Sequence, residues 1–267
     1  MKKFIKIISS IFVVFLIYIL GLYFFQNKFL FVPHNYYISP TEASLPEFKE
    51  EPFTSFDGTE IMTWYYEGDK NKPAILYFHG NSKQIALFSP QLKDFIDRGY
   101  SVMSMEYRGF ANTKGETRQN EIFQDCIKCY DFLKRKGYKN IVVYGYSFGT
   151  ACASALTSFR DVDALVLMAP FYSMKRLVYE KPIPFASYII KDEYPSYKYI
   201  KDYKNPLLIL HGVKDVLIPF HNGEDLFNLS PSKNKEIVSL ENDDHHSIFF
   251  DAKHNDIILK FIENTFK

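Results

Sequence analysis

The sequence is poor in net charge, in cysteine and in repeated or low-complexity segments, and each shortage excludes a class of protein. Lysine and arginine total 32 against 31 for aspartate and glutamate, which gives a formal net charge of +1. This balance offers no electrostatic case for binding a nucleic acid or another strongly charged partner. Because the 267 residues also contain no internal repeat and no low-complexity linker, we expect one globular domain with a short appendage.

Only three cysteines are present, Cys126, Cys129 and Cys152, which is too few for a disulfide framework. Cys126 and Cys129 form a Cys-x-x-Cys pair, but the chain has no second pair that would complete a zinc site. Both lie in a predicted helix at residues 121–136, where residues three apart share a face, so we expect them to pack in the core. No other metal-ligand spacing occurs, and we expect neither a metal nor an organic cofactor.

Charge is also absent from residues 7–25, a run of 19 residues rich in Ile, Leu, Val and Phe. As a helix this run measures about 28 Å, which nearly matches the hydrocarbon thickness of a bilayer. A cleaved signal peptide is the alternative, but bulky aromatic residues occupy the place where the peptidase needs small ones. We therefore predict a transmembrane anchor at residues 1–26 and a globular domain at residues 27–267.

The lysines around this run predict its orientation in the membrane. Lys2, Lys3 and Lys6 precede the run, whereas only Lys28 follows it closely. The positive-inside rule then leaves the N-terminus in the cytoplasm and sends the rest of the chain across. We expect the globular domain to lie on the periplasmic or another extracytoplasmic side.

Strand and helix patterns alternate along the globular part. Apolar strand patterns occur at residues 74–80, 100–109, 140–147, 163–170, 206–212 and 235–242, and helical patterns occur at residues 91–99, 121–137, 150–159 and 249–266. This alternation predicts an α/β fold with a mainly parallel central sheet and helices on both faces. Residues 53–68 predict an antiparallel hairpin that turns at Asp57-Gly58. Between Pro170 and Pro206 there is room for one or two helices, and hence for a small cap or none.

The segment Gly-Tyr-Ser-Phe-Gly, residues 145–149, lies between a predicted strand and a predicted helix. In a Gly-x-Ser-x-Gly turn of this kind the serine is forced into a strained conformation. The residues two positions before and after it need to lack a Cβ, and here both are glycine. The start of the following helix presents unpaired N–H groups and a positive dipole end to any oxyanion formed there. The pattern therefore predicts Ser147 as a nucleophile.

A serine hydroxyl needs a base, and the base needs an acid that orients it. On this type of fold the order along the chain is Ser, then Asp or Glu, then His. Asp215 follows the strand at 206–212, and His245 follows the strand at 235–242. Ligands of such sheets bind beyond the carboxyl ends of the strands, so we expect these side chains to meet. Asp225 is the rival acid, but it lies in a predicted helix.

Five segments resemble, in chain order, the signature segments of the α/β-hydrolase superfamily: YFHGN, EYRGF, GYSFG, LHGVKDVLIP and DDHHSIF. The whole resembles the small membrane-anchored serine-hydrolase branch, whose members include acyl-protein thioesterases and lysophospholipid or monoacylglycerol lipases. That branch also has an N-terminal anchor followed by an aromatic segment ending in proline, as QNKFLFVP does here. The resemblance implies an α/β-hydrolase fold.

The resemblance also implies roles for particular residues. Ser147 is the implied nucleophile, Asp215 the acid and His245 the base. The implied oxyanion hole consists of the backbone N–H groups of Asn81 and Phe148.

The segment around the implied base departs from the family pattern. The family commonly has Gly before the catalytic His and Asn-Asp after it, whereas here Asp244 precedes His245 and His246-Ser247 follow. His246 therefore stays open as the base. The register favours His245, because Ile248 then falls where the family has an apolar residue.

These features predict a serine hydrolase that cleaves carboxylic esters or thioesters through an acyl-enzyme. An anchor at residues 7–25 confines the enzyme to a membrane surface and so favours acyl substrates that are lipids or lipidated proteins. One alternative is a serine peptidase of the aminopeptidase type that uses the same residues. Another is a membrane-tethered binding protein without catalysis, because a fold does not by itself determine a function.

Overall fold

The computed structural model describes residues 1–34 and 36–267. Its strands are β1 (Val32–Pro33), β2 (Lys49–Glu50), β3 (Phe53–Thr54), β4 (Glu60–Ile61), β5 (Thr63–Tyr66), β6 (Ala74–Phe78), β7 (Ser82–Lys83), β8 (Val102–Met105), β9 (Ile141–Tyr146), β10 (Ala164–Met168), β11 (Leu207–Gly212) and β12 (Lys235–Leu240). Its α-helices are α1 (Lys2–Leu30), α2 (Ser89–Asp97), α3 (Gln119–Arg135), α4 (Gly149–Phe159), α5 (Met174–Tyr179), α6 (Ser196–Ile200), α7 (His221–Leu229), α8 (Ser247–Phe250) and α9 (Ala252–Thr265). Two short 3₁₀ helices are η1 (Ile85–Phe88) and η2 (Ala186–Tyr188).

Eight strands form the central sheet in the order β12-β11-β10-β9-β6-β8-β5-β2. The pairs from β12 to β8 are parallel, and β5 and β2 add antiparallel pairs at one edge. Gly145 on β9 is in register with Leu167 on β10 and with Phe78 on β6. The strand that leads to Ser147 therefore lies in the middle of the sheet, and the predicted mainly parallel sheet is confirmed.

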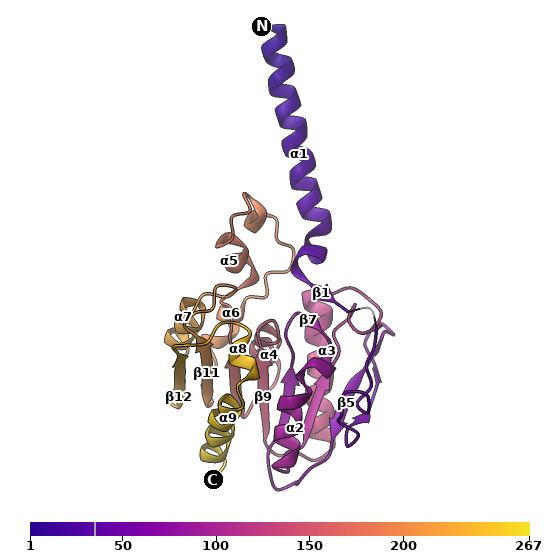
Figure 1. The fold of residues 1–267 in the computed structure, drawn as a ribbon, viewed down its shortest axis with the longest axis vertical. Coiled ribbons are helices and arrows are strands. Elements are labelled where there is room, and N and C mark those ends of the chain that lie inside the picture. The colour runs from indigo at the N-terminus through magenta and orange to yellow at the C-terminus, as the bar shows by residue number, and fades with distance from the viewer. Residues whose placement is uncertain (35) are drawn as a thin grey trace.

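Helices cover both faces of this sheet (Figure 1). Successive residues of a strand point to opposite faces, and β6 shows the result. Leu76 and Phe78 join an apolar cluster that includes α3 and α4, whereas Ile75 and Tyr77 join a second cluster with α2 and α9. Both faces are thus buried, as parallel sheets require.

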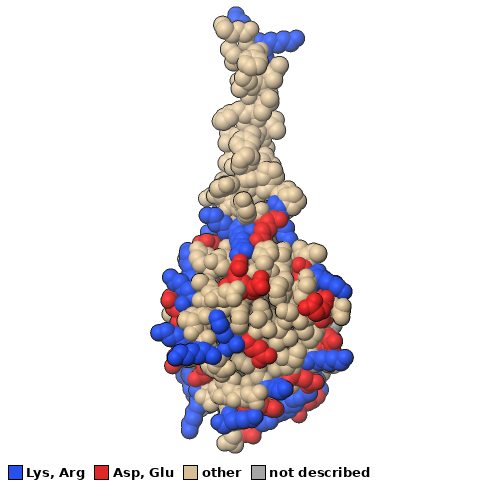
Figure 2. Space-filling view, turned by 90° about the vertical axis from the view of Figure 1, so that its left-hand side faces the viewer, with Lys and Arg blue, Asp and Glu red and all other residues tan. Residues whose placement is uncertain are grey.

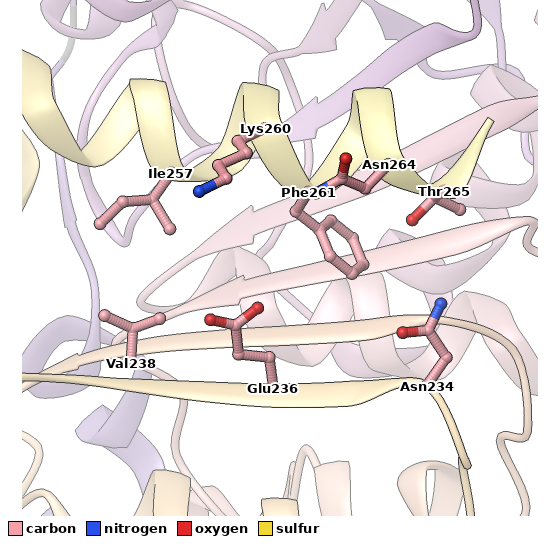
Figure 3. Close-up of a pocket in the computed structure, with 8 residues that line it drawn as sticks. All are labelled: Asn234, Glu236, Val238, Ile257, Lys260, Phe261, Asn264 and Thr265. Carbon is pink, nitrogen blue, oxygen red and sulfur yellow. The ribbon is translucent and has the colours of Figure 1, made fainter. Parts of the chain in front are cut away.

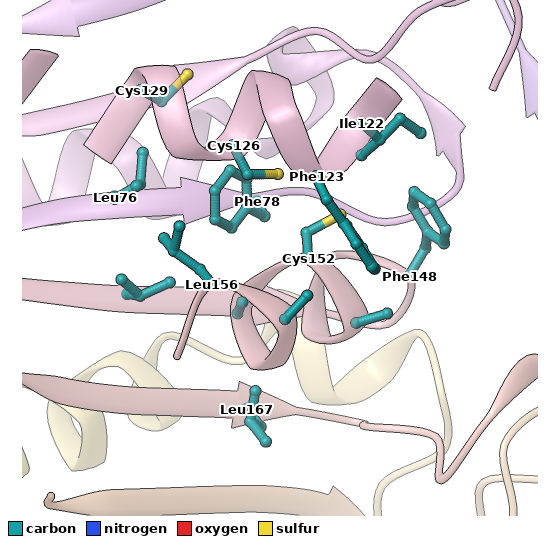
Figure 4. Close-up of a cluster of buried hydrophobic side chains, with 14 of the residues drawn as sticks. Leu76, Phe78, Ile122, Phe123, Cys126, Cys129, Phe148, Cys152, Leu156 and Leu167 are labelled. Carbon is teal, nitrogen blue, oxygen red and sulfur yellow. The ribbon is translucent and has the colours of Figure 1, made fainter. Parts of the chain in front are cut away.

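The three cysteines lie in the first of these clusters. Figure 4 shows Cys126 and Cys129 on α3 and Cys152 on α4, in the apolar layer against the sheet. All three are free thiols and buried, and burial raises the pKa of Cys126 and Cys129. A thiol of this kind is unreactive, so the prediction of core packing is confirmed.

Two predicted segments take a more divided form in the structure. The segment between β10 and β11 contains two short α-helices, α5 and α6, as expected for a small cap, with the 3₁₀ helix η2 between them. The helix predicted at residues 249–266 is present as α9, but its predicted start is wrong, because the extended residue Asp251 separates α9 from the short α8. The Asp251 carboxylate accepts the backbone N–H of Lys253 and so begins a new helix, as N-cap aspartates do.

A buried ion pair joins the predicted hairpin to α3. The Arg108 guanidinium donates through Nε to Asp125 Oδ2 at 2.7 Å, and it also contacts Asp57 in the turn. Arg108 and Asp125 are 2% and 1% exposed. Removing one partner of such a pair leaves an uncompensated buried charge.

We expect Arg108→Met to lower the free energy of unfolding by about 3–5 kcal/mol, measured by urea denaturation of the full chain in detergent. Arg160→Met is the matched control, because Arg160 makes the same kind of paired contact with Asp131 at the surface. Its loss should cost no more than about 1 kcal/mol. If the two variants lost equal free energy of unfolding, burial would not be what makes the Arg108 ion pair matter for stability.

Helix α1 stands out from the domain (Figure 1), and its mean hydropathy reaches 2.6 over its most apolar stretch, none of which is buried. Figure 2 shows no charged side chain between the lysines at its tip and the domain. The helix fits a single-pass membrane anchor. It continues to Leu30, so its last turn extends beyond the predicted boundary at residue 26.

Candidate active site

Ser147 lies in the tight turn between β9 and α4, where its φ of +51° is in the left-handed region. Glycine is needed on both sides of it. A Cβ on Gly145 would collide with the carbonyl oxygen of Gly149, and a Cβ on Gly149 would collide with that of Phe78. The Ser147 N–H donates to Met168 O at 2.9 Å. The motif therefore holds the serine in a strained backbone conformation at the carboxyl end of the sheet. Strain of this kind clusters at functional sites.

Three predicted side chains meet at this end of the sheet. His245 Nε2 lies 2.9 Å from Ser147 Oγ, and His245 Nδ1 lies 2.7 Å from Asp215 Oδ2. An ionised carboxylate can only accept a hydrogen bond, so Nδ1 carries the proton and Nε2 is left to accept that of the serine. All three residues are buried. Chemically, the arrangement can transfer a proton from a serine hydroxyl to an imidazole.

Asp215 is held from two sides. Its Oδ1 accepts the backbone N–H groups of Leu217 at 2.9 Å and Ile218 at 2.7 Å, which leaves Oδ2 for His245. Burial raises the pKa of Asp215, but the neighbouring His211 and the hydrogen bond with His245 outweigh it, so the pKa falls below its ordinary value. Asp215 is therefore an anion at neutral pH and keeps the His245 ring in one orientation.

The two alternative residues, Asp225 as the acid and His246 as the base, do not join the series Ser147, His245 and Asp215. Asp225 lies on α7 and accepts a hydrogen bond from Arg176 at 2.7 Å. The His246 N–H donates to Asp244 Oδ1, and His246 lines the neighbouring pocket instead of bonding to Ser147. The geometry thus favours Asp215 and His245, in agreement with chain order and register.

Sequence reasoning missed Tyr146, which fixes the backbone of His245. Its hydroxyl donates to His245 O at 2.7 Å, and its ring stacks on the imidazole with centroids 5.5 Å apart. The two residues are 99 positions apart, so no local pattern could reveal the contact. His211 is fully buried, and its Nε2 donates to Ile218 O and lies 3.6 Å from Asp215 Oδ2.

We expect Tyr146→Phe to lower kcat about tenfold, because a lost buried hydrogen bond costs about 1–3 kcal/mol and the imidazole is then less firmly positioned. KM for a small soluble ester should not change. Tyr144→Phe is the control, since this hydroxyl lies on the same strand and contacts Gln91 and Met168. A Tyr146 variant with unchanged kcat, or one that raises KM alone, would contradict the positioning role.

The two implied oxyanion donors, Asn81 and Phe148, both line the pocket beside Ser147. Within the described chain, neither backbone N–H is seen to donate to another backbone carbonyl. The Asn81 side chain donates to Leu30 O at 2.6 Å, and Val32 N–H donates to Asn81 O. The loop that carries Asn81 is therefore tied to the chain that leaves α1.

Buried polar groups also hold the loop that carries Asn81. Tyr107 donates its hydroxyl to His79 O at 2.7 Å, and Glu106 Oε1 accepts the N–H of Ile85 at 2.7 Å. The His79 ring is fully buried and lies 3.4 Å from Glu106. His79 thus has a structural place beneath the loop that carries Asn81.

A cavity of about 690 Å³ opens beside Ser147. Its walls are largely apolar, and they come from α1 and β1, from the chain after β6, from the turn at Ser147, from the cap and from the loops after β11 and β12. The lining residues are Leu22, Gln26, Phe29, Leu30, Val32, Asn81, Ser82, Ser147, Phe148, Phe171, Met174, Leu177, Val178, Lys181, Ile183, Ala186, Ile189, Ile190, Leu217, Ile218 and His246. The volume is that of an ordinary small-molecule site. The contribution of α1 was not predicted.

A second cavity of about 450 Å³ lies between β12 and α9, and Figure 3 shows Glu236 and Lys260 on its opposite sides. None of the predicted site residues lines it, so it is not a candidate for the chemistry. Across residues 1–34 and 36–267, no group of three or more His, Cys, Asp or Glu side chains is arranged to hold a metal ion.

Known proteins resemble this chain in sequence or in fold. The family model described as serine aminopeptidase, S33, matches residues 69–200. The uncharacterized protein YfhR of Salmonella typhimurium is 25% identical over 288 residues, covering 97% of this chain and 96% of YfhR. The lysophosphatidylserine lipase ABHD12 of Rattus norvegicus is 28% identical over 235 residues, covering 74% of this chain and 57% of ABHD12.

Among solved structures, the esterase Pf2001 of Pyrococcus furiosus superposes with a TM-score of 0.72 at 17% identity, covering 88% of this chain and 98% of Pf2001. At that identity the likeness shows the fold alone. The matching family model and the sequence relatives support hydrolase activity of the α/β-hydrolase type. The family model, the sequence relatives and the shared fold thus support the α/β-hydrolase superfamily, with lipases and esterases among the proteins similar to this chain.

Proposed function

We propose that the protein is a serine hydrolase that cleaves carboxylic esters or thioesters of acyl, lipid-like substrates through an acyl-enzyme. The observation that carries the proposal is the hydrogen-bonded series Ser147, His245 and Asp215, with distances of 2.9 Å and 2.7 Å, beside a largely apolar cavity. Such a series activates a serine in many unrelated enzymes.

In the proposed mechanism, Ser147 Oγ attacks the acyl carbonyl carbon while its proton moves to His245 Nε2. The backbone N–H groups of Asn81 and Phe148 stabilise the tetrahedral oxyanion, where one such donor is typically worth about 2.7–4 kcal/mol. The alcohol or thiol then leaves with the proton held by His245. A water molecule, deprotonated by His245, hydrolyses the acyl-enzyme and releases the carboxylic acid, while Asp215 stabilises the imidazolium at both steps.

The cavity supports an acyl substrate. Its walls contain many aliphatic side chains, among them Leu177, Val178 and Ile190, and few charges. Such walls suit a hydrocarbon chain, whose burial is worth about 0.8 kcal/mol per methylene. The likeness to a lysophosphatidylserine lipase points to the same class of substrate, a lipid or a lipidated protein in the membrane.

We also place the protein in the membrane as a single-pass chain, with residues 1–26 as the anchor and residues 27–267 as the catalytic domain. The charge-free run in α1 and the lysines before it support an N-terminus in the cytoplasm and a catalytic domain on the extracytoplasmic side. A peptidase of the aminopeptidase type is the second candidate, favoured by the description of the matching family.

The test is a comparison of substrates by the purified full chain in detergent. p-Nitrophenyl esters from acetate to palmitate should be hydrolysed, with kcat/KM rising with chain length, whereas aminoacyl p-nitroanilides should be poor substrates. A preference for the anilides would establish the peptidase instead. Failure of the folded protein to cleave either class would favour the non-catalytic binding protein and overturn the proposal.

A further inference from the structure

The apolar cavity is closed on one side by the predicted membrane helix. Leu22, Gln26, Phe29 and Leu30 of α1 line the cavity that also contains Ser147. Residues of the loop 182–190, among them Ile183, Ile189 and Ile190, line the same cavity. The anchor is therefore a wall of the candidate active site as well as a tether, and the cavity lies where the chain leaves the bilayer.

The loop 182–190, which we call the apolar loop, has a composition suited to lipid. It reads PIPFASYII and contains no charge, but Lys181 and Lys191 flank it. Ile183, Phe185 and Tyr188 are 45%, 54% and 76% exposed. Large apolar side chains gathered at one place on a surface mark an interaction site.

Contacts with α1 place the apolar loop beside the membrane span. The Phe185 ring packs edge-on against Phe15 with centroids 5.4 Å apart, and Tyr18 donates its hydroxyl to Pro184 O at 2.9 Å. Figure 1 shows the segment after α5 rising from the domain beside α1. Phe15 lies about 15 Å along the helix from Phe25, where the charge-free run ends. Since the hydrocarbon layer is about 30 Å thick, a loop that touches Phe15 lies within it whenever α1 spans it.

The polar groups of the apolar loop are arranged for such a position. Irregular backbone at membrane depth requires that its hydrogen bonds be satisfied within the protein. Pro182 and Pro184 have no N–H to satisfy. Gln26, a buried residue of α1, donates to Ile189 O at 3.3 Å and accepts the N–H of Lys191 at 2.8 Å.

The two flanking lysines mark the level of the headgroups. Lys191 Nζ lies 4.1 Å from the centroid of the Tyr23 ring, and Lys181 Nζ donates to Leu217 O at 2.8 Å. Lysine and tyrosine are the residues that proteins place at the boundary between hydrocarbon and water. The apolar loop thus extends from this boundary towards the middle of the bilayer.

We propose that the apolar loop is inserted in the same leaflet as the last turns of α1, and that the cavity opens between the two into that leaflet. The acyl chain of a membrane-resident substrate then reaches Ser147 from the bilayer without crossing water. The part that concerns substrate access rests on the proposed hydrolase activity, whereas the insertion of the loop rests only on the proposal that α1 spans a membrane.

Insertion is tested by fluorescence in phosphatidylcholine vesicles whose acyl chains carry bromine, a contact quencher. The full-length chain has a single tryptophan, Trp64, which is fully buried and supplies the background. In Phe185→Trp the added emission should be blue-shifted and mostly quenched. In the control Phe159→Trp, at the end of α4 remote from Ser147, it should be unquenched. An unquenched tryptophan at 185, or equal quenching at both positions, would overturn the insertion.

Access from the bilayer is tested by Phe185→Asp, at a side chain that does not line the cavity. Hydrolysis of a long-chain ester in vesicles should fall about tenfold, because a large apolar side chain is withdrawn from lipid, while a soluble butyrate ester should be cleaved at the wild-type rate. Phe159→Asp should alter neither rate. Equal loss on both substrates, or on neither, would overturn the route. A wild-type chain that cleaves neither ester refutes the proposed function, yet leaves the fluorescence result intact.

Discussion

Ser147→Ala is expected to lower kcat for a p-nitrophenyl ester by roughly 10⁶-fold, the loss found when the nucleophile of a serine triad is removed. The reason is that Ser147 Oγ lies 2.9 Å from His245 Nε2 at the end of β9, so the substitution removes the hydroxyl that the proposed base would deprotonate. Initial rates with the purified chain in detergent give the measurement.

The matched control is Ser154→Ala. This serine lies on α4, is fully buried, and its hydroxyl has no hydrogen-bond partner within the described chain. The variant should keep its activity. Thermal unfolding of both variants should match the wild type closely, since a change from serine to alanine alters little volume at either position. A Ser147→Ala variant that is folded and keeps more than about one-hundredth of the activity would contradict a role in the triad.

His245→Ala is expected to lower kcat by roughly the same 10⁶-fold factor, whereas His246→Ala should leave it within a few-fold of the wild type. The two residues are adjacent, but only His245 bridges Ser147 and Asp215. His246 lines the cavity, so its replacement can change KM for long acyl chains. Steady-state kinetics with butyrate and palmitate esters separate the two effects.

The opposite ranking of these variants would assign the base to His246 and would require the loop after β12 to rearrange. Added imidazole supplies a further check, because a small base that diffuses into the emptied site of His245→Ala should restore part of the activity. It should not restore any to Ser147→Ala, which lacks the nucleophile itself.

The parts of the fold that depend on local sequence were predicted well. The motif at residues 145–149 requires both glycines because of close backbone contacts within one turn, and such contacts leave a signature in the adjacent residues. The positions of Asp215 and His245 followed from chain order on a parallel sheet. Their catalytic roles stay predictions, although the structure brings both side chains to Ser147.

Features that depend on distant segments were missed. Nothing near residue 146 indicates that the Tyr146 hydroxyl holds the carbonyl of His245. The charge-free run predicted a membrane span, but it did not indicate that Gln26 and Leu30 would line the cavity, because that contact requires the cap to fold against α1. The break at Asp251 was missed for another reason. Apolar residues recur on both sides of it, and their periodicity concealed the helix N-cap at Asp251.

The most direct test of the central claim is to locate a covalent adduct. The purified full chain would be treated with a fluorophosphonate probe, which reacts with activated serines, and the labelled peptide identified by mass spectrometry. The structure predicts one adduct, on Ser147, that is lost in His245→Ala and retained in His246→Ala. A folded wild-type chain that takes up no probe, or an adduct on any other residue, would contradict the account.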